Sequence, residues 1–69
     1  MQGMEYFDYE PVAKEAGLSR EQLRRLEEVV GRDYPDDLML FELHVLRACN
    51  AIRDRRITFE KAVSEPAET

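Results

Sequence analysis

Apolar residues recur at helical spacing in two long segments of the chain, and shorter apolar groups flank both segments. The stripe of the first segment consists of Leu23, Leu26 and Val30. These positions are three and four residues apart, so they share one face of a helix. Ser19 precedes the stripe as a good N-cap, and Gln22, three residues later, completes a capping box. The pattern predicts a helix that starts after Ser19 and ends at Gly31.

The second long segment follows a connector at Arg32–Tyr34 and predicts a helix that runs to about Asp54. Its start is expected at Tyr34-Pro35-Asp36-Asp37, because proline and acidic residues are favoured in a first turn. The main apolar stripe is Leu38, Phe41, Val45, Cys49 and Ile52, and a second one is Met39, Leu43 and Leu46. A strand is the alternative for Leu40–Leu46, where apolar and polar residues alternate, but the length of the periodic segment and the lack of a hairpin turn favour a helix.

Shorter elements are predicted at both ends. Pro11 fits the first position of a two-turn helix that Gly17 ends. After a turn at Arg55-Arg56, Thr58 caps a last short helix, whose inward residues are Phe59, Ala62 and Val63. The aromatic rings of Met1–Glu10 (Tyr6, Phe7 and Tyr9) are expected to cover the core, and the polar residues 64–69 are expected to be disordered. The sequence therefore predicts an all-α fold of three to four helices in one domain, residues 1–63.

Val12–Leu26 has the spacing of a helix-turn-helix corner. Its small and apolar positions are Val12, Ala13, Ala16, Gly17, Leu18, Leu23 and Leu26. Ala13 allows the two helices to cross closely, Gly17 makes the turn, and the leucines fill the angle between the helices. A helical corner with no role in nucleic-acid binding is the alternative interpretation.

The net charge and the length of the chain bear on these predictions. The 69 residues carry a net charge of −5, which opposes nucleic-acid binding overall, but the charge is uneven. Residues 14–32 carry +1, residues 33–46 carry −4 and residues 47–61 carry +3. A chain this short buries only about 60% of its unfolded surface, so its core is marginal. The single cysteine, Cys49, excludes an intrachain disulfide and favours a reducing, cytoplasmic location.

Tyr6 through Glu27 resembles the start of MerR-type regulators, in which a short aromatic lead precedes VAKxxGxSxxxLRxxE. The matching residues are Val12, Ala13, Lys14, Gly17, Ser19, Leu23, Arg24 and Glu27. Ile52-Arg53-Asp54 and Ile57–Ala62 resemble the next two helices of that family, so the resemblance covers residues 6–63. It implies a DNA-binding helical corner.

The sequence also departs from the family. Gly31–Pro35 is too short for the family's β-hairpin wing, and the long dimerisation helix is absent. Arg25 and Leu26 replace two usual aromatics, and Arg56 stands where a glycine is usual. The modulators of J-domain co-chaperones resemble the same corner and bind protein, although this chain lacks their usual tryptophan.

Two functions follow as expectations. In the first, a small regulatory protein binds DNA through its second helix, with Arg20 and Glu21 reading bases, Ser19 and Arg24 holding phosphates, and Arg25 one turn further along. The alternative for these residues is a solvated face of intrahelical ion pairs. Arg53, Arg55, Arg56 and Lys61 form a second basic block, either a phosphate contact or a solubilising turn.

In the second function, an adaptor binds a protein partner or a second copy through Met39, Leu43 and Leu46. Catalysis is not expected, because so short a chain offers no evident pocket. His44 is a lone histidine and Cys49 a lone cysteine, so neither a metal site nor a cofactor is expected. No apolar run approaches the length of a membrane span, and a signal-peptide pattern is lacking.

Overall fold

The computed structural model describes residues 6–64, which form four α-helices and no strand. The helices are α1 (Glu10–Glu15), α2 (Arg20–Asp33), α3 (Leu38–Arg53) and α4 (Phe59–Val63). The predicted all-α fold is confirmed, and the alternative of a strand at Leu40–Leu46 is wrong, since this stretch lies inside α3. No helix in the described part of the chain combines the length and apolar character that crossing a membrane requires.

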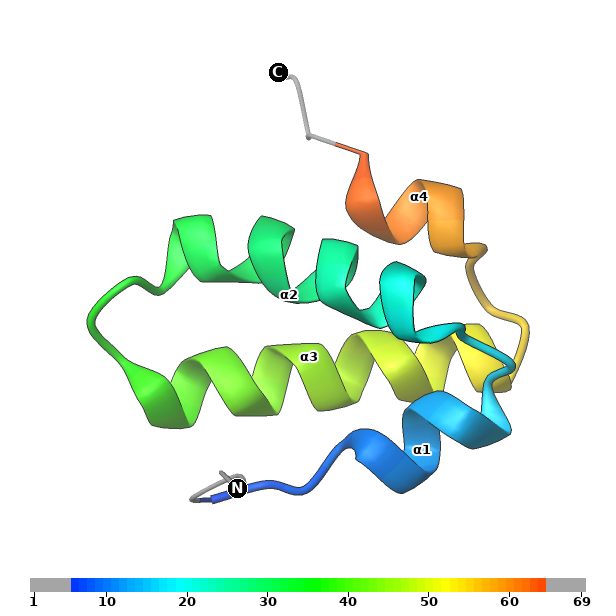
Figure 1. The fold of residues 1–69 in the computed structure, drawn as a ribbon, viewed down its shortest axis with the longest axis horizontal. Coiled ribbons are helices and arrows are strands. Elements are labelled where there is room, and N and C mark those ends of the chain that lie inside the picture. Colours follow the sequence, from blue (N-terminus) through cyan, green and yellow to red (C-terminus); the bar gives the residue numbers. More distant parts are fainter. Residues whose placement is uncertain (1–5, 65–69) are drawn as a thin grey trace.

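The long helices α2 and α3 run antiparallel, and α1 and α4 pack against them (Figure 1). α1 packs mainly against α3, while α4 lies over the first half of α2 and also contacts α3. The start of α2, the end of α3 and the turn between α1 and α2 therefore lie at one end of the molecule. The connection between α2 and α3 lies at the opposite end.

The core lies between α1, α2 and α3. Its buried residues are Tyr9, Ala13, Leu26, Val45 and Cys49. Leu26, Val45 and Cys49 are fully buried, and the ring of Tyr9 meets that of Phe41 edge-on with 6.5 Å between the ring centres. Phe59, Ala62 and Val63 of α4 pack against this core, as their spacing predicts.

Local capping explains most helix boundaries. The predicted capping box at Ser19 is confirmed, and Thr58 caps α4 by accepting from the Lys61 N–H at 3.1 Å. Gly17 has a φ of 80°, and the N–H groups of Gly17 and Leu18 bond back to the carbonyls of α1. This is a Schellman turn, which needs a left-handed residue after the helix.

The end of α3 uses the same turn with a different residue. Arg55 has a φ of 64°, its N–H donates to the Ile52 carbonyl, and the Arg56 N–H donates to the Ala51 carbonyl. The left-handed position is therefore Arg55, one residue before Arg56. A non-glycine residue there costs about 1 kcal/mol or more.

The connection between α2 and α3 differs from the prediction. α2 continues through Gly31 to Asp33, and the Tyr34 N–H closes onto the Val30 carbonyl at 3.3 Å. α3 begins only at Leu38, because Asp37 is its N-cap and accepts from the Leu40 N–H at 3.1 Å. Pro35 and Asp36 thus lie in a turn outside the helix.

Two predicted core residues are exposed instead. Leu38, assigned to the main stripe of α3, is 46% exposed and lies at the first position of the helix, next to the turn. Tyr6 is 57% exposed, whereas Tyr9 is buried as predicted. The predictions for Met1–Glu5 and 65–69 lie outside the described residues.

Candidate nucleic-acid interface at the basic end

The capping box fixes the start of α2. The Ser19 Oγ accepts from the Gln22 N–H at 3.1 Å, and the Gln22 Oε1 accepts from the Ser19 N–H at 2.8 Å. Both bonds satisfy donors that a helix start otherwise leaves without partners. The first turn of α2 is therefore a rigid platform for the side chains that follow Ser19.

All five residues predicted to face DNA are exposed: Ser19, Arg20, Glu21, Arg24 and Arg25. Ser19, Arg20, Glu21 and Arg24 line one open hollow with a volume of 410 Å³. Arg25 lies around the helix on the side of α4, where it lines a second hollow with Phe59 and Val63. The structure thus gathers four of the five residues on one surface and places Arg25 at its border with α4.

The arginines on this surface lack ionic partners. Within residues 6–64, Arg20, Arg24 and Arg25 form no ion pair, so the intrahelical pairs that would neutralise them are not made. Glu27, which is three residues after Arg24, accepts instead from the Tyr9 hydroxyl at 2.6 Å. The guanidinium groups remain available to an external anion.

The second basic block lies at the same end of the molecule, because α3 ends where α2 begins (Figure 1). Residues 14–25 and 53–61 together hold eight of the ten basic residues of the chain and four of its fifteen acidic residues. The Arg53 guanidinium donates to the Glu15 carboxylate at 3.0 Å, which links the ends of α3 and α1. We call this region the basic end.

Of the residues predicted to bind a protein partner, Met39 is 46% exposed. Leu43 is half-buried. Leu46 is also half-buried and packs against the core. The most open apolar side chains of α3 are therefore Leu38 and Met39, and of the predicted group Met39 alone is among them.

Sequence reasoning missed the role of Glu42. This residue is 3% exposed, and its Oε1 accepts from the Tyr6 and Phe7 N–H groups at 2.7 and 2.9 Å. The signal lay in the non-helical residues before Pro11, whose backbone donors need acceptors when they lie against the core. A carboxylate among the apolar residues of α3 supplies one.

His44 and Cys49 both have structural environments. The His44 Nδ1 donates to the Leu40 carbonyl at 2.8 Å, and its Nε2 lies 3.2 Å from the Tyr34 hydroxyl. Burial, together with the nearby Glu27 charge, raises the pKa of the Cys49 thiol to about 11, which suppresses the reactive thiolate. Across residues 6–64, no group of three His, Cys, Asp or Glu side chains is arranged to hold a metal ion.

Comparisons with known proteins give no further assignment. No protein-family model, curated protein or solved structure matches this chain.

Proposed function

We propose that this protein binds duplex DNA through the start of α2, as a small regulatory protein of the helix-turn-helix kind. The observation that carries the proposal is the set of exposed arginines without ionic partners, Arg20, Arg24 and Arg25, on a capped first turn. Arginine can bind guanine edges or phosphates bidentately, and the start of a recognition helix is the part that reaches base edges.

Arg20 and Glu21 would contact bases, since they occupy the first helical turn, and Ser19 and Arg24 would hold the phosphates beside them. Arg25 would contact the backbone on the side of α4. Phosphate contacts dominate the affinity of such proteins, and the second basic block lies close enough to add to them.

The left-handed Arg55 supports the proposal independently. A glycine would adopt this conformation without strain, so the arginine side chain is kept there at an energetic cost. Backbone strain of this kind is concentrated at functional sites. Arg55 is exposed and lies within the basic end, which fits a phosphate contact.

The acidic balance of the rest of the chain does not prevent this binding. The four acidic residues of segments 14–25 and 53–61 leave these segments with a net charge of +4, and the nearby Glu10 lines a hollow with Lys14 and Arg20. One short helix buries little DNA surface, so the affinity should be modest and strongly dependent on salt.

The test is fluorescence anisotropy with a labelled duplex of mixed sequence at low salt. Arg24→Glu should weaken binding by about tenfold or more, because it replaces a phosphate contact with a repulsive charge. Arg47→Glu is the matched control, since Arg47 is an exposed arginine on α3 outside the basic end. Circular dichroism checks that both variants remain helical.

Three outcomes would reject the proposal. They are no binding by the unmodified protein at low salt, binding that does not weaken as salt rises, and equal losses for Arg24→Glu and Arg47→Glu. The last of these would indicate a response to net charge alone.

A further inference from the structure

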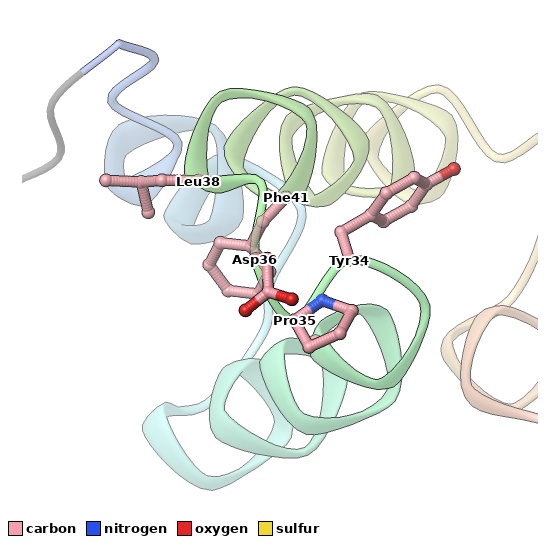
Figure 2. A pocket seen from close by; sticks show the side chains of 6 residues that line it. Tyr34, Pro35, Asp36, Leu38 and Phe41 are labelled. Atoms are coloured by element: carbon pink, nitrogen blue, oxygen red, sulfur yellow. The ribbon is translucent and has the colours of Figure 1, made fainter.

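An open pocket lies at the corner between α2 and α3, at the end of the molecule opposite the basic end (Figure 1). It has a volume of 360 Å³ and is lined by Gly31, Tyr34, Pro35, Asp36, Leu38 and Phe41. In Figure 2, the Phe41 ring lies between Leu38 and Tyr34, with Asp36 and Pro35 in front of it. We call this region the acidic corner.

The pocket exists because α2 continues past Gly31 and α3 starts late. Gly31 has no side chain to cover the Phe41 ring, and a Cβ built on Gly31 would lie 3.7 Å from the Phe41 Cε1. Leu38 begins α3 and is nearly half exposed, and the neighbouring Met39 is equally exposed. The corner therefore presents apolar side chains that the fold itself leaves uncovered.

The sequence around the pocket is negatively charged, and Asp36 is the aspartate that lines the pocket itself. Asp33, Asp36 and Asp37 are all exposed, and residues 31–41 carry a net charge of −2. Asp33 is the last residue of α2, where the negative end of the helix dipole makes another negative charge unfavourable. Arg32, in the last turn of α2, offsets part of this charge, and the net negative charge that remains favours a positively charged partner.

A second copy of the chain does not fit the pocket. A symmetric pair would place the three aspartates of one copy against those of the other, which is repulsive. Elsewhere in residues 6–64, the large apolar side chain that is exposed is Tyr6, which lies in the acidic segment before α1. The basic end therefore offers no apolar anchor that could enter the pocket of another copy.

We propose that the acidic corner docks a basic peptide segment of another protein, with an apolar side chain against Phe41 and Leu38 and lysine or arginine residues against the aspartates. The volume lies at the lower end of the roughly 300–1,000 Å³ of ligand pockets, which suits one or two side chains. Because the two ends are opposite, the protein can hold DNA and this peptide together.

The experiment selects short random peptides displayed on phage against the immobilised protein and maps the selected peptides by NMR. The expected peptides combine a leucine or aromatic residue with several lysines or arginines, and they shift the amide signals of Gly31–Phe41. Leu38→Ser and Asp36→Lys should each weaken binding by about tenfold or more, because one removes the anchor contact and the other reverses a rim charge.

Two matched variants separate this site from the basic end. Glu60→Lys makes the same charge change as Asp36→Lys on exposed α4, and it should leave peptide binding intact. Arg24→Glu should also leave peptide binding unchanged, so failure at one end is distinguishable from failure at the other.

The proposal is overturned if no peptide is enriched, if the enriched peptides are not basic, or if the shifted amides lie outside the corner. It is also overturned if sedimentation shows that the protein associates with itself and that Leu38→Ser abolishes the association. That result would assign the pocket to a second copy.

Discussion

The two ends of the α2–α3 pair are built in different ways. The basic end combines residues 14–25 with residues 53–61, two segments far apart in the sequence that meet because the helices are antiparallel. The acidic corner comes from one continuous stretch, residues 31–41. The acidic corner is therefore formed by residues close in sequence, whereas the basic end depends on how the two helices pair.

The charged side chains at the two ends also differ in their environments. At the basic end, Arg53 is held by carboxylates, while Arg20, Arg24 and Arg25 have no ionic partner within residues 6–64. Near the acidic corner, Asp33 and Asp36 are exposed, whereas Glu42, one turn into α3, is buried and accepts backbone N–H groups. Buried carboxylates contribute to stability, and the exposed charges are available for binding.

The largest effect is expected when the buried carboxylate is removed. Glu42→Ala should lower the free energy of unfolding by about 2 kcal/mol, because it leaves the Tyr6 and Phe7 N–H groups without their charged acceptor. Glu42→Gln retains an acceptor oxygen and should lower the free energy of unfolding by a smaller amount. Chemical denaturation measures the change, and hydrogen exchange should show faster exchange of both amides.

Glu28→Ala is the matched control, since Glu28 is exposed on α2 and should change stability by no more than about 0.5 kcal/mol. Equal losses for Glu28→Ala and Glu42→Ala would mean that the attachment of the N-terminal segment contributes nothing to stability.

The dependence of stability on alkaline pH tests two buried groups of the core between the two ends, Cys49 and Tyr9. Burial raises the pKa of Cys49 from 9.0 to about 11, and burial, followed by the hydrogen bond to Glu27, raises the pKa of Tyr9 above its usual value of 10.0. Both groups are neutral in the folded protein and ionise more readily in the unfolded chain. The stability that they contribute is therefore complete below pH 9 and is lost as the pH rises. The free energy of unfolding should fall by about 1–2 kcal/mol by about pH 10.

Urea denaturation at a series of pH values measures this decline. Cys49→Ala removes one of the two groups and should flatten the curve between pH 9 and pH 10. A curve of the same slope in the variant would show that Cys49 does not carry the effect.

The two Schellman turns at the basic end provide the smallest and most precise comparison. Gly17→Ala should destabilise the protein by about 1 kcal/mol, because alanine is strained at a φ of 80° although its Cβ has open space. Arg55→Gly should stabilise it by about 0.5–1 kcal/mol, because it relieves the strain of the same conformation.

Arg55→Gly should also weaken DNA binding, since it removes a cation from the basic end. Thermal unfolding and anisotropy of the same sample measure both effects. A variant that gained stability and bound DNA as before would remove Arg55 from the proposed interface.

Local chemistry made several elements predictable. The side chains of Ser19 and Thr58 cap helices through bonds that span three residues, and Gly17 supplies a left-handed conformation that needs no distant contact. The exposure of Arg20 and Arg24 likewise follows from their positions opposite the apolar stripe of α2.

At two other positions, the local sequence is compatible with two different structures. Glycine is typical of the residue that follows a helix, yet α2 continues through Gly31, which lies against the Phe41 ring of α3. Leu38 has the spacing of the core stripe, but the cap at Asp37 places it at the open end of α3. In both cases the deciding contacts lie in the turn and in the neighbouring helix.

The sequence by itself determined the helical periods, the caps and the glycine turn, because these depend on backbone hydrogen bonds and side chains within a few residues. Only the tertiary structure decided that Glu42 is buried, that Leu38 is exposed and that the two basic blocks meet. These outcomes depend on which surfaces the antiparallel helices cover, and burial is a property of the whole packed chain.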